Sequence, residues 1–160
     1  MNPFLLDIIK PLEDDSFYEI VVIDGDKNFI KNGYLLSMPS QRRIIIKNDI
    51  PDFENIEINK HPQKEVYNFW WNESHKFYEY NEDKSKNIFS KTIKIKEKDF
   101  NESKVLDLGC GNGRFSNIIS KYNPSLLVLF DISDGIFTAY ENAKRNCKNV
   151  IAIKGNILNI

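Results

Sequence analysis

The second half of the chain alternates short apolar runs with amphipathic segments. Residues 105–108, 126–130 and 150–153 are largely or wholly apolar, which is typical of buried strands. Between them, apolar residues over 115–122 and 136–147 recur with the spacing of one helix face. Asn123 and Pro124 predict the end of the first helix, and Ser133 predicts the N-cap of the second. Strand-helix-strand-helix-strand predicts a parallel sheet with right-handed crossovers.

The first sixty residues follow a different pattern, that of a small, mostly β unit. Helical spacing over residues 4–9 ends at Pro11, and the apolar runs 18–23, 29–30, 34–38 and 43–46 predict short strands. Asp24-Gly25-Asp26 and Asn32-Gly33 are tight-turn signals that favour hairpins. Pro51 closes the segment.

Residues 63–80 predict a helix that is dense in aromatic side chains. These apolar positions are a core-facing stripe or, in a second interpretation, cover a ligand pocket: Val66, Tyr67, Trp70, Trp71, Phe77 and Tyr78. Residues 81–87, rich in lysine and asparagine, predict a connector. We therefore expect three parts: a small domain over 1–60, the aromatic helix with its connector over 61–103, and an α/β unit over 104–160.

Composition and charge narrow the class of protein. The chain is 41% hydrophobic and 28% charged, its net charge is −1, and it contains no apolar run of membrane-spanning length. The N-terminus lacks the pattern of a signal peptide, so we expect a cytoplasmic protein. The absence of a basic excess argues against a nucleic-acid partner.

Cysteine and histidine are scarce. Cys110, Cys147, His61 and His75 are the whole set, and no Cys-x-x-Cys pair occurs. This spacing offers neither a zinc site nor a disulfide framework. We expect both cysteines to be small buried residues.

A glycine-rich turn follows the first strand of the α/β unit. Gly109, Gly111 and Gly113, three of seven glycines, let the backbone turn sharply and approach a nucleoside cofactor. The spacing differs from that of dinucleotide sites, because Phe115 stands where their third glycine would lie. Asp107 at the strand end would repel a pyrophosphate but attract a ligand that carries an ammonium and a sulfonium.

A second acidic residue ends the next strand. Asp131 follows Gly109 by 22 residues, where a carboxylate can accept hydrogen bonds from both ribose hydroxyls of a nucleoside. The alternative is an acid that stabilises the N-terminus of the following helix. Ile132 could pack on an adenine face.

Residues 105–115 resemble the first motif of class I S-adenosylmethionine-dependent methyltransferases, and Asp131 matches the second acidic position of that family. Residues 154–157 are similar to its third region, although Asn156 replaces the commoner aspartate. The resemblance covers about residues 64–160 and implies a partial Rossmann-like methyltransferase fold that binds S-adenosylmethionine. It places these residues around the cofactor: Asp107, Leu108, Gly109, Cys110, Gly111 and Gly113 by the methionine portion, Asp131 by the ribose, and Ile132, Asn156 and Ile157 by the adenine.

Residues 1–55 show a fainter resemblance. Residues 5–8 and 46–51 are similar to a zinc-ribbon-like domain that activates some methyltransferases. The zinc cysteines of that domain are absent, so the resemblance implies a metal-free derivative.

These features predict the cofactor-binding half of a methyltransferase that acts on a small molecule. No side chain stands out as a catalytic base. His75 on the aromatic helix is a candidate base, and the alternative, which we favour, is a solvent-facing helix residue. The family's sheet has more than three strands, and in its strand order the third strand would be outermost and the first would be left as an edge. We therefore expect an N-terminal part of a longer enzyme, incomplete alone, or a partner chain that completes the sheet. Two alternatives are a non-catalytic partner or scaffold module and a fragment of an NAD-dependent oxidoreductase.

Overall fold

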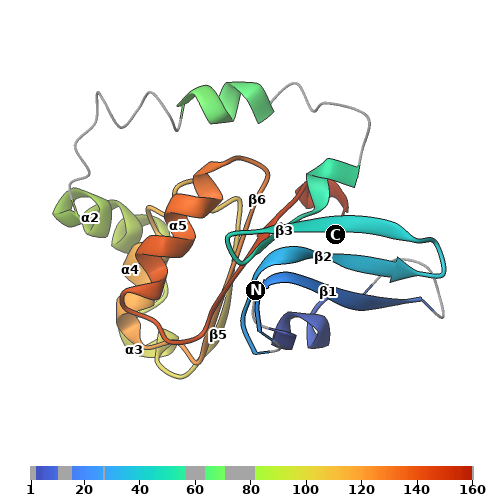
Figure 1. Ribbon diagram of the computed structural model, residues 1–160. Coiled ribbons are helices and arrows are strands. Elements are labelled where there is room, and N and C mark those ends of the chain that lie inside the picture. The colour runs from blue at the N-terminus through green and yellow to red at the C-terminus, as the bar shows by residue number, and fades with distance from the viewer. Residues whose placement is uncertain (1–2, 11–15, 27, 57–63, 71–81, 160) are drawn as a thin grey trace.

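One seven-stranded mixed sheet, in the order β1-β2-β3-β4-β7-β6-β5, runs through the protein. The computed structural model describes residues 3–10, 16–26, 28–56, 64–70 and 82–159. Figure 1 shows helices α2, α4 and α5 on one side of the molecule and the antiparallel strands β1, β2 and β3 on the other. The mixed α/β class predicted from the sequence is confirmed.

The parallel part of the sheet forms as predicted. β5 (Lys104–Leu108), β6 (Leu126–Asp131) and β7 (Val150–Lys154) are parallel neighbours, connected through α4 (Ser116–Ile119) and α5 (Gly135–Lys144). A 3-10 turn, η3 (Ser120–Tyr122), extends α4 and ends where Asn123 adopts a left-handed backbone with φ 55°. The predicted stop at Asn123 is confirmed, because a left-handed residue terminates a helix.

The N-terminal unit is an antiparallel meander. It contains η1 (Pro3–Asp7), β1 (Phe17–Gly25), β2 (Ile30–Met38), β3 (Arg42–Lys47), β4 (Ile50–Asp52) and η2 (Phe53–Ile56). The predicted turn after Asp24 is confirmed, and Gly25 there has φ +112°. The turn predicted at Asn32-Gly33 is wrong, because Gly33 pairs inside β2 and a Cβ there would lie 2.2 Å from the carbonyl oxygen of Val21.

The meander joins the parallel strands through β4. Asp52 of β4 pairs in parallel with Lys154 of β7, so β7 is not the outermost strand, contrary to the expectation from the family's strand order. The opposite edge is β5, as expected. Leu106 and Leu108 on β5 align with Val128 and Phe130 of β6, but they are not part of the core in which those two residues pack, and their exposed fractions are 56% and 44%.

Two hydrophobic cores lie on the two faces of the parallel strands β6 and β7. On the helical face, α4 and α5 pack on alternate residues of β6 and β7, including Leu127, Leu129 and Ala152. On the other face, the N-terminal meander packs on the intervening residues: Leu5, Ile30, Leu35, Ile44 and Ile46 meet Leu126, Val128, Phe130, Ile151 and Ile153. The meander therefore covers the face that the helices leave free, which explains why β6 and β7 are buried on both sides.

Two helices replace the predicted connector. α2 (Glu82–Thr92) is followed by α3 (Glu97–Phe100), so the loop expected over 81–87 is wrong from residue 82 onward. Glu82 forms ion pairs with Lys86 at 3.0 Å and Lys121 at 2.6 Å. Phe89 anchors α2 in the helical core.

Residues 64–70 form a short helix whose large side chains are exposed. Val66, Tyr67, Phe69 and Trp70 have exposed fractions between 46% and 64%. A core-facing stripe is therefore wrong for this part of the predicted helix. Trp71, His75, Phe77 and Tyr78 lie outside the described residues.

Among the helices that the structure describes, none has the length and apolar character needed to cross a membrane.

Candidate cofactor site

The glycine turn wraps over the carboxyl end of β6. The backbone N–H groups of Gly109 and Cys110 donate to the carbonyl oxygen of Phe130 at 2.8 and 3.1 Å. Gly109, Gly111 and Gly113 all have positive φ, of 77°, 56° and 83°. At Gly109, an added Cβ would meet no atom within 4 Å, so the backbone borders open space where a ligand can approach.

Asp131 fixes this turn from the end of β6. Its Oδ2 accepts the Gly111 N–H at 2.7 Å, and its Oδ1 accepts the Ser133 N–H at 2.8 Å and the Ser133 hydroxyl at 2.6 Å. The Ser133 hydroxyl therefore bonds Asp131 instead of capping α5, and the expectation of an N-cap at Ser133 is wrong: Asp134 occupies that position. Ionised carboxylates accept such bonds strongly, so Asp131 holds two loops together.

Asp107 lies half-buried on the adjacent strand. The Ser116 hydroxyl at the start of α4 donates to its Oδ2 at 2.5 Å. Burial raises the pKa of Asp107, the Ser116 hydrogen bond lowers it, and the nearby Asp131 carboxylate raises it, with a net increase. A desolvated carboxylate beside a second one is unfavourable until a cation arrives, so this pair favours a positively charged ligand group.

Helix α5 packs very closely against the turn. A Cβ on Gly113 would lie 2.7 Å from both Cα and Cβ of Ala139, and a Cβ on Gly135 would lie 2.9 Å from the carbonyl carbon of Gly111. Close packing is thus achieved between the turn and α5. This role of Gly135 could not be predicted from the sequence, because Gly135 lies outside the glycine motif.

The carboxyl end of β7 carries a buried cation. Lys154 Nζ lies 3.4 Å from Oδ2 of Asp52 and forms an ion pair with Asp134, while its side chain is only 6% exposed. Burial lowers the pKa of Lys154, but the carboxylates of Asp134 and Asp52 outweigh burial and raise it above its ordinary value. This cluster, which sequence analysis missed, ties β4, β7 and the start of α5 together.

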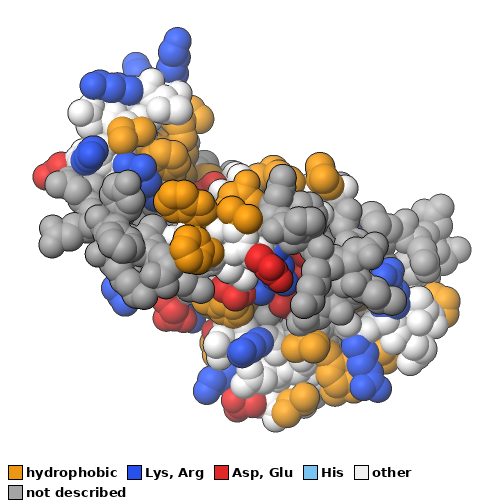
Figure 2. Space-filling model, turned by 90° about the horizontal axis from the view of Figure 1, so that it is seen from above, with side chains coloured by type: hydrophobic (Ala, Val, Ile, Leu, Met, Phe, Trp, Pro, Cys, Tyr) orange, Lys and Arg blue, Asp and Glu red, His pale blue; other side chains and the backbone are white. Residues whose placement is uncertain are grey.

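The remaining predicted residues lie along the same edge. Register aligns Leu108 with Phe130 and Asp131 with Lys154, so Ile132, Asn156 and Ile157 follow directly beyond the strand ends. Oδ1 of Asn156 accepts the Leu158 N–H at 3.0 Å, and Ile157 is 49% exposed. Viewed from this end, the molecule shows acidic side chains near the middle of the face, with hydrophobic side chains beside them (Figure 2).

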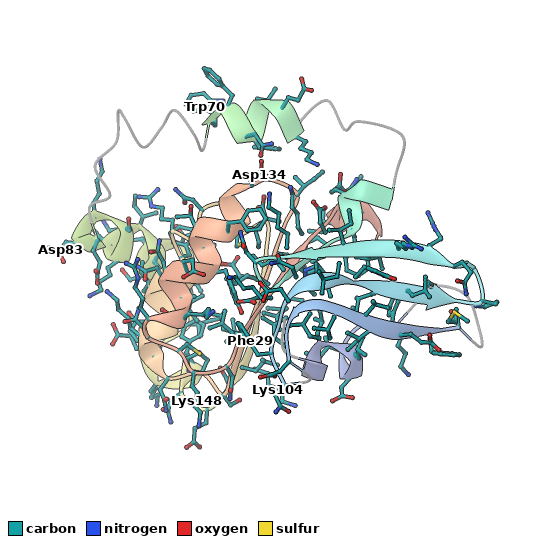
Figure 3. The ribbon with its side chains drawn as sticks, viewed as in Figure 1. Phe29, Trp70, Asp83, Lys104, Asp134 and Lys148 are labelled. Carbon is teal, nitrogen blue, oxygen red and sulfur yellow. The ribbon has the colours of Figure 1, made fainter. Side chains whose placement is uncertain are left out.

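The helix over residues 64–70 is fixed above this edge. The backbone N–H of Asp134 donates to Oδ1 of Asn68 at 2.8 Å. Figure 3 shows Asp134 beneath this helix, while Trp70 points away from the molecule. A second tie joins α2 to the turn, because Arg114 donates through Nε to the buried hydroxyl of Ser85 at 3.0 Å.

The cysteines are structural. Cys110 and Cys147 are buried and free, as expected. Burial and the carboxylates of Asp107 and Asp131 raise the pKa of the Cys110 thiol far above its ordinary value. The thiol is therefore protonated at neutral pH and is a poor nucleophile. No group of three or more His, Cys, Asp or Glu in the described segments could hold a metal ion.

Comparison with known proteins identifies the family but not a near relative. Residues 70–159, more than half of the chain, match the family described as "Methyltransferase small domain". Neither the curated proteins nor the solved structures contain a match. The match begins after the N-terminal meander, so the resemblance of residues 1–55 to an activator domain stays a prediction. With its glycine turn at the carboxyl edge of a parallel sheet, the chain belongs to the methyltransferase small domain family.

Proposed function

We propose that this chain binds S-adenosylmethionine at the glycine turn and provides the cofactor-binding part of a methyltransferase that acts on a small molecule. The observation that carries the proposal is the open backbone at Gly109 beside the paired carboxylates of Asp107 and Asp131. Membership of a methyltransferase family agrees with it.

The chemistry of these residues suits the cofactor. S-adenosylmethionine carries an ammonium and a sulfonium, and both attract the carboxylate of Asp107, whose pKa is raised because burial disfavours its charge. A dinucleotide would instead bring a pyrophosphate beside two acids, which Coulomb repulsion disfavours. The space at Gly109 admits a ligand next to the backbone.

Each residue has a distinct part in this proposal. Asp107 and the turn from Gly109 to Gly113 would hold the methionine portion, and Leu108 and Cys110 would shape that end. Asp131 would accept one hydrogen bond from the ribose, because a carboxylate has about four acceptor sites and Asp131 already accepts three bonds. Ile132, Asn156 and Ile157 would border the adenine.

The bound cofactor supplies an activated methyl group. The residues of this chain then contribute by fixing the donor in one orientation and by excluding water, since positioning provides much of the acceleration in such transfers. We assign no catalytic base. The small-molecule acceptor in this proposal rests on the absence of a basic excess in the sequence.

A second function has its own supporting observation. The exposed edge of β5, with Leu106 and Leu108, offers unpaired backbone and apolar side chains to a further strand. A non-catalytic module that completes its sheet with a partner chain would use this edge. Such a module would bind no cofactor, so a titration with S-adenosylmethionine separates the two functions.

The test is a calorimetric titration of the chain with S-adenosylmethionine, S-adenosylhomocysteine and NAD. We expect binding of the first two and none of NAD. Gly109→Ala should abolish binding, because its Cβ would enter the open space, while Ser40→Ala in the turn between β2 and β3 should bind normally. A folded wild-type chain that binds none of the ligands would contradict the proposal and favour the scaffold module.

A further inference from the structure

The N-terminal meander has one face in the core and one face turned outward. Alternation along β2 and β3 sends Leu35, Ile44 and Ile46 into the core between the meander and β6 and β7. The intervening residues share the opposite side, which we name the outer face: Phe17, Glu19, Val21, Tyr34, Leu36, Met38, Arg43, Ile45 and Lys47.

The outer face is largely apolar. Phe17 and Ile45 have exposed fractions of 54% and 48%, and Val21, Tyr34, Leu36 and Met38 are partly exposed around them. The guanidinium of Arg43 lies 5.0 Å from the centroid of the Tyr34 ring, which places both side chains on this face. Single exposed apolar residues are ordinary, but a contiguous apolar face with a few charges is typical of an interaction surface.

The charges on the outer face have an ordered arrangement. Strand pairing sets Glu19, Leu36 and Arg43 side by side in one row across β1, β2 and β3. The next row, Val21, Tyr34 and Ile45, is uncharged. The face therefore has an acid at its β1 side, a base at its β3 side and an apolar centre on β2. Neither Glu19 nor Arg43 forms an ion pair within the described part of the chain.

We propose that the outer face packs against the outer face of a second copy of this chain, about a two-fold axis parallel to β2. Such a rotation lays β1 of each protomer over β3 of the other. Glu19 then lies opposite the partner's Arg43, and this pairing occurs twice. Leu36 and Tyr34 meet their own copies at the centre, and face-to-face sheets with roughly aligned strands are a common packing.

The positions of Glu19 and Arg43 favour this two-fold axis over others, and a second copy of the chain over other partners. A two-fold axis across the strands would stack β1 on β1 and would leave Glu19 and Arg43 without opposite charges. A membrane surface or a nucleic acid favours a uniformly basic face, whereas the outer face also carries the acid Glu19. The outer face is formed by β1–β3 and the glycine turn follows β5, so this association does not depend on the proposed function.

The test measures the mass of the full chain by size exclusion with multi-angle light scattering. We expect the mass of two chains for the wild type. Glu19→Arg and Arg43→Glu should each weaken association by ~100-fold and give the mass of one chain, because like charges would then face each other twice. The double variant E19R/R43E should restore the dimer.

A mixture of the two single variants provides a sharper test. E19R carries two bases and R43E two acids at the facing positions, so an equimolar mixture should form a heterodimer, which native mass spectrometry would detect as one chain of each kind. Circular dichroism confirms that each variant folds. A monomeric wild type, or an association that neither single variant changes, would overturn the proposal. The second result would assign association to another surface, such as the edge of β5.

Discussion

The backbone N–H of Gly111 donates to Oδ2 of Asp131 at 2.7 Å across 20 residues of sequence. This bond connects the turn after β5 to the loop after β6, and the same carboxylate also accepts two donors from Ser133. Asp131 therefore holds the candidate site in shape before any ligand binds. A preorganised site loses less conformational entropy on binding than a flexible loop would.

Asp131→Asn should destabilise the protein. The amide keeps one acceptor oxygen and turns a donor toward N–H or O–H groups, so at least one buried donor loses its partner, at a cost of ~1–3 kcal/mol. Ser133→Ala is the matched control, because it removes only the hydroxyl donor and should cost ~1 kcal/mol. Urea denaturation measures both, and equal stability of Asp131→Asn and the wild type would show that these bonds do not support the fold.

Two glycine variants should separate binding from stability. Gly109→Ala forces an alanine into a left-handed backbone, which costs ~1–2 kcal/mol, but its Cβ meets no neighbour. Gly113→Ala carries the same backbone cost and adds overpacking against Ala139, for another ~1–3 kcal/mol. We therefore expect Gly109→Ala to be the more stable of the two in denaturant and yet to lose cofactor binding. The opposite order of stability would contradict the geometry of the turn.

Asp107→Asn should leave stability equal to or higher than that of the wild type near neutral pH. Folding raises the pKa of Asp107, so its ionised form is disfavoured in the folded state above that pKa, and this cost disappears as the pH falls through it. An asparagine oxygen can still accept the Ser116 hydroxyl.

The same variant should lose affinity for S-adenosylmethionine, because its amide carries no charge toward the ammonium or sulfonium. Thermal denaturation and calorimetry check the two effects separately. A variant that is less stable but binds normally would assign Asp107 to the fold alone.

Lys154→Met should destabilise the junction between the meander and the parallel strands. Removing the buried ammonium leaves Asp52, 14% exposed, without its cation, and breaking a buried pair in this way costs ~3–5 kcal/mol. Asp134→Asn should cost less, since Asp134 is half-exposed. The raised pKa of Lys154 means that its contribution to stability is complete below its ordinary pKa of 10.5 and is lost as the pH rises through the higher folded value.

The pH dependence gives this prediction a second measurement. The difference in unfolding free energy between wild type and Lys154→Met should stay constant up to pH ~9 and shrink at more alkaline pH. A difference that grows with pH would contradict the assignment of Lys154 as a paired cation.

The sequence predicted the parts of the fold that local patterns encode. The five apolar residues of 126–130 predicted a strand buried on both faces, and glycines after a strand end predicted the turn. Predictions from the sequence were wrong where contacts between distant segments determine the structure. Asn32-Gly33 is a strong local turn signal, yet Gly33 lies mid-strand because Val21 approaches it too closely for any side chain. A turn that the sequence analysis did not predict connects β3 to β4 through Asn48 and Asp49, both of which have positive φ.

The same limit applies to the candidate site. Asp107, Gly109 and Asp131 could be found because they belong to one short motif and to a strand end at a typical spacing. The cluster of Lys154, Asp52 and Asp134 could not be found, because pairing between β4 and β7 joins segments that are distant in the sequence. Helix α2 was not predicted because its sequence is mostly charged and polar. Phe89, which packs in the helical core, does not by itself form an apolar helix face.

Nuclear magnetic resonance can show whether S-adenosylmethionine binds at the glycine turn. Glycine amides have distinctive nitrogen shifts, and two of the seven glycines, Gly25 and Gly33, lie in the N-terminal meander, away from the turn. Titration with S-adenosylhomocysteine should move the amide signals of Gly109, Gly111 and Gly113 and leave those of Gly25 and Gly33 in place. Unchanged signals at the turn in a folded chain, or changes confined to Gly25 and Gly33, would contradict the account.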